Sequence, residues 1–163
     1  MVEEHKDCTT KEDYLQVVKN TQIVSVNMVV LNNEGQVLLG YRNDAPAKGK
    51  WFVPGGRVYK HEKIPDAVRR VTKEQLGHEL EHVRELGVFH HYYDDNFDNK
   101  RFGTQCIVFA VVIRLKEPAQ LVKNDQHAAL HWWNVADLKA NDSVHQHTKD
   151  YFHLSPPNKI FKY

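Results

Sequence analysis

The feature that most constrains this chain is a pair of glycines, Gly55-Gly56, followed after a short loop by an amphipathic segment, Ile64–Leu76. The segment predicts a helix because apolar side chains recur at the i, i+3, i+4, i+7 spacing that gathers them on one face. These side chains are Ile64, Ala67, Val68 and Val71. Pro65 is tolerated in a first helical turn, and Gly77 is a suitable residue to end the helix. Adjacent glycines let backbone approach a ligand closely, and a helix N-terminus favours negative charge, so this region is the candidate site.

The polar residues of the same helix leave two interpretations open. Asp66, Arg70 and Glu74 are spaced four apart and share a face. Gln75 falls on the buried stripe, since successive helical residues are rotated by about 100°, and a buried polar side chain needs a partner. One interpretation is a surface ladder of ion pairs with a hydrogen-bonded core glutamine. The other is a ligand site that uses these polar groups.

The rest of the chain alternates helical and strand patterns irregularly. Helical segments are expected at Thr10–Asn20, Val135–Leu138 and Val144–Phe152. Strands are expected at Gln22–Leu31, Gln36–Arg42, Leu86–Tyr93, Gln105–Leu115 and Ala129–Trp133. The first two strands form a hairpin through a turn at 32–35, and the tail around Pro156-Pro157 is expected to be irregular. These patterns predict an α/β fold of the α+β type with a mixed sheet, and 163 residues fit a single domain, residues 1–163.

Composition and charge exclude several classes of function. The formal net charge is only +1, so no basic field indicates binding to nucleic acid. No apolar run approaches the roughly 18 residues of a membrane span, and the charged N-terminus lacks an apolar signal core. Cys8 and Cys106 lie far apart without a metal-ligand pattern, which favours a reducing compartment over a disulfide framework. A cytoplasmic location is expected.

The spacing of the polar residues resembles the loop–helix–loop signature of the Nudix hydrolases. Five residues separate the second glycine from the first Glu, and seven separate that Glu from the Arg. The matching residues are Gly56, Glu62, Arg70, Glu74 and Gly77. The resemblance implies a Nudix fold, in which a mixed β-sheet is sandwiched between helices, and it implies that carboxylates of the helix bind a divalent metal.

The similarity to one subfamily, the GDP-mannose mannosyl hydrolases, covers nearly the whole chain. Six short runs carry it: Leu38–Arg42, Pro46-Ala47, Trp51–Arg57, Tyr93–Phe97, Asp125-Gln126-His127 and Ser143-Val144-His145. This resemblance implies that water attacks the anomeric carbon of a nucleoside-diphosphate sugar, so that the products are the nucleoside diphosphate and the free sugar. It also implies a homodimer whose ligand is a small nucleotide sugar.

The resemblance assigns roles to individual residues. The Mg²⁺ ion, with Mn²⁺ as an alternative, would be held by the Gly55 carbonyl, Gln126 and position 75, with Glu74 as the remaining helix carboxylate; the metal helps the diphosphate leave. His127 would be the general base, since a neutral imidazole suits that task at cellular pH. The other residues with implied roles are Arg42 and Arg57 for the charge on the leaving diphosphate, Arg70 for orienting the helix carboxylates, and Asn27 and His91 for the substrate.

Four positions depart from the family pattern and keep other functions open. Val71 and Gln75 replace carboxylates of the helix, Asn27 replaces an Asp, and Cys106 replaces a Tyr that contacts the nucleotide. Loss of a carboxylate should weaken Mg²⁺ binding, because Mg²⁺ prefers anionic oxygens. Two alternatives therefore stand beside the glycosyl hydrolase. One is a pyrophosphohydrolase that breaks a P–O bond, and the other is a catalytically weak protein that binds nucleotide sugars.

Overall fold

The computed structural model describes residues 10–115, 121–122 and 124–161, and Cys8 lies outside them. Four helices occur in these ranges: α1 (Lys11–Asn20), α2 (Ile64–Leu76), α3 (Val135–Ala140) and α4 (Gln146–Asp150). The strands are β1 (Ile23–Leu31), β2 (Val37–Arg42), β3 (Trp51–Phe52), β4 (Gly55–Arg57), β5 (Arg84–Tyr93), β6 (Thr104–Arg114) and β7 (His127–Trp133). No described helix has both the length and the apolar content that crossing a bilayer requires.

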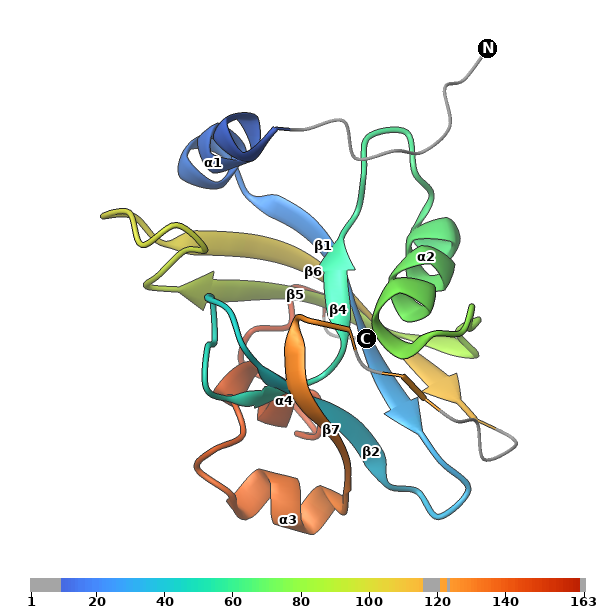
Figure 1. The fold of residues 1–163 in the computed structure, drawn as a ribbon. Coiled ribbons are helices and arrows are strands. Elements are labelled where there is room, and N and C mark those ends of the chain that lie inside the picture. Colours follow the sequence, from blue (N-terminus) through green and yellow to red (C-terminus); the bar gives the residue numbers. More distant parts are fainter. Residues whose placement is uncertain (1–9, 116–120, 123, 162–163) are drawn as a thin grey trace.

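A mixed sheet forms the centre of the molecule, with β3, β2, β1, β6 and β5 in that order (Figure 1). β1 runs parallel to β6, and the other pairs are antiparallel. The predicted hairpin of β1 and β2 is confirmed only beside its turn, where Leu31 pairs with Val37. Beyond that pair the strands part, because β4 pairs with β1 and β7 pairs with β2. This separation brings Gly55 and Gly56 of β4, which we call the glycine corner, onto the sheet.

Helices cover both faces of the sheet, as the α+β prediction requires. Side chains on alternate positions of a strand point to opposite faces. Val26 and Met28 of β1 belong to a core cluster that includes Val68 and Val71 of α2. Val29 belongs to a second cluster that includes Leu138 of α3. Two cores therefore hold the sheet between α2 and the C-terminal helices.

Local signals explain where the elements begin and end. The Thr10 hydroxyl accepts a hydrogen bond of 3.1 Å from the Asp13 amide and caps α1, as its sequence predicts. Gly77 ends α2 in the left-handed conformation, with φ of 80°. Two expectations need correction. Val144 is not helical but bridges to Trp51, and the tail is not wholly irregular, because Lys159 bridges to Phe89 of β5.

Candidate active site

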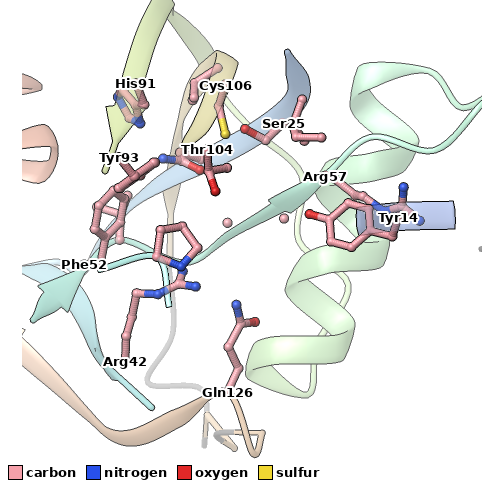
Figure 2. Close-up of a pocket in the computed structure, with 17 residues that line it drawn as sticks. Tyr14, Ser25, Arg42, Phe52, Arg57, His91, Tyr93, Thr104, Cys106 and Gln126 are labelled. Carbon is pink, nitrogen blue, oxygen red and sulfur yellow. The ribbon is translucent and has the colours of Figure 1, made fainter. Parts of the chain in front are cut away.

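A cavity of about 160 Å³ lies where the sheet, the glycine corner and α1 meet (Figure 2). Tyr14 of α1, Arg57 of β4 and Gln126 before β7 contribute to its wall. An outer depression of about 600 Å³ shares Tyr14, Arg42 and Gln126 with it. Of the residues with roles implied by sequence, six line the inner cavity: Asn27, Arg42, Gly55, Arg57, His91 and Gln126. The fold therefore gathers most of the predicted site at one place.

Arg42 is a half-buried cation at the end of β2. Its guanidinium makes no ion pair with any residue in the described ranges, and its one hydrogen bond there goes to the Asp44 carbonyl, at 3.5 Å. Burial lowers the pKa of Arg42 below its ordinary value, and Tyr93 and Asp44 counteract this only in part. A partly desolvated cation without a carboxylate partner is costly. Arg42 is thus prepared to bind an anion that enters the cavity.

Arg57 is held in place by aromatic rings. Its guanidinium lies 4.5 Å from the ring centre of Tyr14 and 5.2 Å from that of Tyr59. The Tyr14 ring also stacks on Phe97, with centroids 5.1 Å apart. Such cation–π contacts fix the direction of a guanidinium without neutralising its charge. Tyr14 lies within the helix expected at Thr10–Asn20, and nothing in its spacing distinguishes a cavity-lining ring from a core ring.

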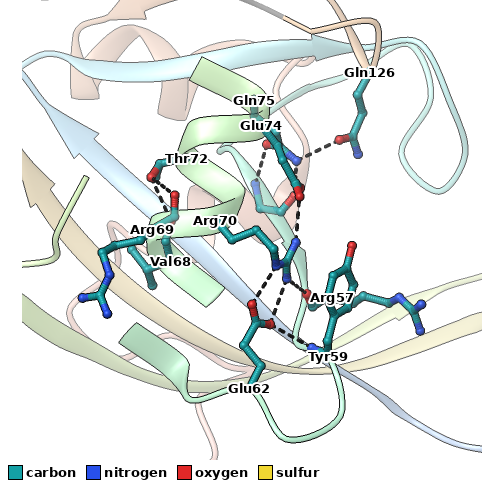
Figure 3. Close-up of polar contacts among 11 residues, drawn as sticks. Arg57, Tyr59, Glu62, Val68, Arg69, Arg70, Thr72, Glu74, Gln75 and Gln126 are labelled. Carbon is teal, nitrogen blue, oxygen red and sulfur yellow. Dashed lines mark hydrogen bonds and ion pairs between the residues drawn. The ribbon is translucent and has the colours of Figure 1, made fainter. Parts of the chain in front are cut away.

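Gly55, Gln75 and Gln126, which were expected to hold a metal, lie together and hydrogen-bond to one another. The Gln75 side chain is buried at the end of α2. Its Nε2 donates to the Gly55 carbonyl at 2.6 Å and to Gln126 Oε1 at 2.8 Å (Figure 3). Its Oε1 accepts from the Gly55 amide at 3.2 Å. A β-carbon at position 55 would collide with the Asn27 side chain, so only glycine lets the backbone of β4 lie this close to Asn27 of β1.

The carboxylates of the signature region are engaged by Arg70 instead. Arg70 donates to both oxygens of the buried Glu62, at 2.7 and 2.9 Å, and to Glu74 at 3.2 Å. It also donates to the Arg57 carbonyl at 2.8 Å, which ties α2 to the cavity wall. The expected ladder along the helix face is only partly formed, because Asp66 pairs with Arg69 rather than Arg70. Arg70 thus contacts Glu62 and Glu74, its role in orienting helix carboxylates stays a prediction, and Glu74 is exposed and outside the cavity lining.

These donors do not fit a divalent cation. Gly55 O and Gln126 Oε1 are neutral, and both already accept hydrogen bonds from Gln75. Mg²⁺ prefers carboxylate oxygens, yet Glu62 and Glu74 are bound to Arg70. Across the described ranges, no three or more His, Cys, Asp or Glu side chains gather where they could hold a metal. We therefore derive no chemical step through a metal.

A buried polar network lies beneath the cavity. Asn27 donates to the Tyr151 hydroxyl at 2.8 Å, and that hydroxyl lies 3.3 Å from His91 Nε2. His91 stacks on His147, with ring centroids 4.1 Å apart. Burial, followed by the nearby His147 and His145, lowers the pKa of His91 to about 2, so the ring is neutral. His91 Nδ1 is buried and has no hydrogen-bond partner within the described residues.

His127, the implied general base, lies next to the cavity but not in its lining. The residue is 1% exposed and opens β7 opposite Arg42 of β2. Its ring occupies the space above Gly40, where any β-carbon would collide with it. Gln126, its neighbour, faces the cavity directly. Gln126 lies in the turn before β7 and His127 is the first residue of the strand, so these neighbours in sequence have different surroundings.

Cys106 also lines the cavity, at the position where the resemblance expects a larger ring. Burial raises the pKa of its thiol to about 11, although Ser25 and Arg42 counteract the shift. The thiol therefore stays protonated and is a small, weakly polar part of the wall. Tyr93 and Thr104, which sequence analysis did not single out for the site, complete this side of the cavity.

Sequence comparison places these features in a known context. A family model described as NUDIX domain matches residues 21–154. The chain is 42% identical over 95 residues to low-salt glycan biosynthesis protein Agl8 of Haloferax volcanii, a match that covers 56% of this chain and 60% of Agl8. It is 29% identical over 144 residues to putative nudix hydrolase 1 of Caenorhabditis elegans, covering 86% of this chain and 36% of that protein. The chain thus spans less than two thirds of either relative's length.

Solved structures share the fold. A MutT NUDIX hydrolase from Burkholderia pseudomallei superimposes with a TM-score of 0.67 at 25% identity, covering 81% of this chain and 96% of that one. The NUDIX domain of Shewanella oneidensis NrtR, in a complex with ADP ribose, gives a TM-score of 0.62 at 19% identity, with 88% and 97% covered. The fold expected from the loop–helix–loop resemblance is confirmed.

Proposed function

Since the chain belongs to the NUDIX domain family, we propose that it binds a nucleoside-diphosphate sugar and hydrolyses it to the nucleoside diphosphate and the free sugar. The observation that carries the proposal is the charge of the inner cavity. Arg42 and Arg57 both line it, and no Asp or Glu is found among its described lining residues. A diphosphate is the part of such a ligand that two guanidinium groups bind best.

The same charge distribution favours cleavage at carbon. In that reaction the water oxygen bonds to the anomeric carbon, the bond from that carbon to the diphosphate oxygen breaks, and its electron pair stays on the diphosphate. One water proton is released. Negative charge therefore grows on the leaving group, where Arg42 and Arg57 stabilise it. His127 is proposed as the base that accepts the proton, from its 1% exposed position next to the cavity lining.

Two similar proteins support the substrate class. Agl8 is described as a glycan biosynthesis protein. The NrtR domain was solved with ADP ribose, in which a diphosphate also joins a nucleoside to a sugar, at C5 of that sugar rather than at its anomeric carbon. GDP-mannose is our first candidate substrate, from the resemblance to the mannosyl hydrolases.

Two other functions remain as alternatives with specific grounds. Cleavage of a P–O bond is the alternative within the family, and the lack of a metal-binding carboxylate cluster among the described residues argues against it. A binder with weak catalysis is favoured by the hydrogen bonds that Gln75 makes with the expected metal ligands. Nudix hydrolases generally use divalent metal ions such as Mg²⁺. The Mg²⁺ or Mn²⁺ dependence implied for this chain stays a prediction, against which its neutral donor set argues.

A product assay in ¹⁸O-labelled water separates these functions. The purified protein is incubated with GDP-mannose or GDP-glucose in Mg²⁺, in Mn²⁺ and in EDTA, and the products are identified by mass spectrometry. Label in the free sugar, together with unlabelled nucleoside diphosphate, supports the proposal. Label in a phosphate would show P–O cleavage and overturn it. Binding without turnover in every condition would also overturn it, in favour of the weak binder.

The homodimer and the cytoplasmic location that sequence analysis expects also stay predictions. Sedimentation velocity at micromolar concentrations tests the first, and fractionation of cells that produce the full-length protein tests the second.

A further inference from the structure

The Gln75 carboxamide joins three segments that are distant in sequence: the end of α2, the glycine corner of β4 and the segment before β7. A primary amide carries two N–H donors, and both are used, one on the Gly55 carbonyl and one on Gln126 Oε1. The amide oxygen accepts from the Gly55 N–H. At 4% exposure, water has little access to the side chain.

The hydrogen bonds themselves determine which way the amide points. A rotated amide would place Nε2 against the Gly55 N–H, donor against donor. It would also place Oε1 against the Gly55 carbonyl and Gln126 Oε1, so that three oxygens would meet. Rotation of the Gln126 amide as well would restore one hydrogen bond, but the two to the backbone of Gly55 would still be lost and replaced by repulsion, unless a cation lies among the oxygens.

We propose that the Gln75 amide nitrogen takes over, in this chain, the bridging task of a divalent cation, so that this corner of the site is assembled without metal. The amide nitrogen contacts the two oxygens that the resemblance assigns to the metal. It carries a partial positive charge there and holds both oxygens in place. Gln75 is a positioning residue in this scheme, and the charge of a bound diphosphate falls to Arg42 and Arg57. The inference concerns the protein without nucleotide and does not depend on the proposed reaction.

Replacing the amide by a carboxylate should reverse the behaviour of the site. In wild type, Gln75 Nε2 lies 2.6 Å from Gly55 O and 2.8 Å from Gln126 Oε1. In Gln75→Glu, an oxygen replaces this nitrogen. Without metal this oxygen repels the Gly55 carbonyl oxygen, a fixed acceptor, and Gln126 must rotate its amide to avoid a second repulsion. With metal it supplies the anionic ligand that the wild-type chain lacks. The variant should therefore depend on a cation for stability, whereas the wild type should not.

The test measures thermal unfolding and Mn²⁺ binding of the full chain without nucleotide. Wild type, Gln75→Glu, Gln75→Leu and the control Glu74→Gln are each melted in EDTA and in excess Mg²⁺, and Mn²⁺ binding is followed by calorimetry. Wild type should melt at the same temperature in both solutions. Gln75→Glu should melt lower than wild type in EDTA, rise in Mg²⁺, and bind Mn²⁺ at least about tenfold more tightly, equivalent to about 1.4 kcal/mol.

Gln75→Leu keeps the size of the side chain and removes the bridge. Its melting temperature should fall by the same amount in EDTA and in Mg²⁺. Because this variant retains any cation site elsewhere in the chain, its Mn²⁺ binding is subtracted from that of wild type. Glu74→Gln should behave as wild type. The inference is overturned if Mg²⁺ stabilises wild type but not Gln75→Leu, because the amide oxygen would then be a metal ligand. Wild type and Gln75→Leu decide this even if Gln75→Glu fails to fold.

Discussion

At the scale of single residues, Arg42 is the position where loss of a side chain should lower activity without lowering stability. It is half-buried without an ion pair in the described part of the chain, so its charge is costly to the folded protein and useful to a bound anion. We predict that Arg42→Gln lowers turnover of a nucleotide sugar by about 100-fold while the unfolding free energy stays equal or rises. Steady-state kinetics and urea titration measure the two effects.

Arg69→Gln is the matched control for this variant. Arg69 pairs with Asp66 on the surface of α2, outside the cavity lining. Its loss should leave turnover unchanged. Equal turnover in wild type and Arg42→Gln would remove Arg42 from the proposed mechanism.

His127 allows a similar separation of two roles. As a general base, its replacement by Gln should reduce kcat by about 10²–10⁴-fold and flatten the rise of the rate with pH. As a packing residue above Gly40, its replacement should lower the unfolding free energy and leave the shape of the pH profile intact. The exposed His131 lies on the same strand, and His131→Gln serves as the control. We predict the first pattern, and an unchanged profile would contradict it.

At the scale of elements, α2 shows where sequence prediction succeeds. Its bounds were predicted to the residue, because an apolar stripe, a proline in the first turn and a terminal glycine all act locally. The burial of Gln75 was also predictable from its rotation about the helix axis. The partners of Gln75 were not, because Gly55 and Gln126 reach it only through the pairing of β4 with β1 and β7 with β2.

The same helix gives a prediction about stability. Glu62 has a side chain that is only 1% exposed and binds Arg70 through two oxygens. Without Glu62, the largely buried Arg70 keeps only the exposed Glu74 as a carboxylate partner, and removing one partner of a buried pair is strongly destabilising. We expect Glu62→Gln to lower the unfolding free energy by about 3 kcal/mol. Glu74→Gln, which removes a 51% exposed partner of the same Arg70, should change it by less than about 1 kcal/mol. Equal effects in denaturant titrations would refute the anchoring role of Glu62.

At the scale of the whole molecule, the class of fold was predictable and its connections were not. Alternation of residues such as Met28 and Val29 predicts a sheet covered on two faces, and both cores are present. The strand β4 was missed because three residues of the sequence Gly-Gly-Arg carry no strand pattern. The cavity depends on that strand, so its lining could be assembled from sequence only through resemblance to a family.

The buried histidines tie β5 to the C-terminal part of the molecule and should make its stability depend on pH. Burial is the largest cause that lowers the pKa of His91 to about 2 and of His145 to about 4. Nearby His147 adds to both shifts, Lys50 and Arg42 add to that of His145, and Asp150 opposes the latter. Between these values and the ordinary value of 6.5, the unfolded chain binds more protons than the folded one. Stability is therefore complete above pH 6.5 and decreases as the pH falls toward 4.

We predict that the unfolding free energy of the wild type decreases from pH 7.5 to pH 5, and that His91→Gln reduces this decrease. Each proton taken up only by the unfolded chain contributes about 1.4 kcal/mol per pH unit, and the variant lacks one such proton. Urea titrations at several pH values give the slope, which is informative even if the variant is less stable throughout. His153→Gln removes an exposed histidine and is the control. If His91→Gln keeps the wild-type slope, His91 is not the buried neutral group that the cavity requires, and its role as an uncharged contact for the ligand fails with it.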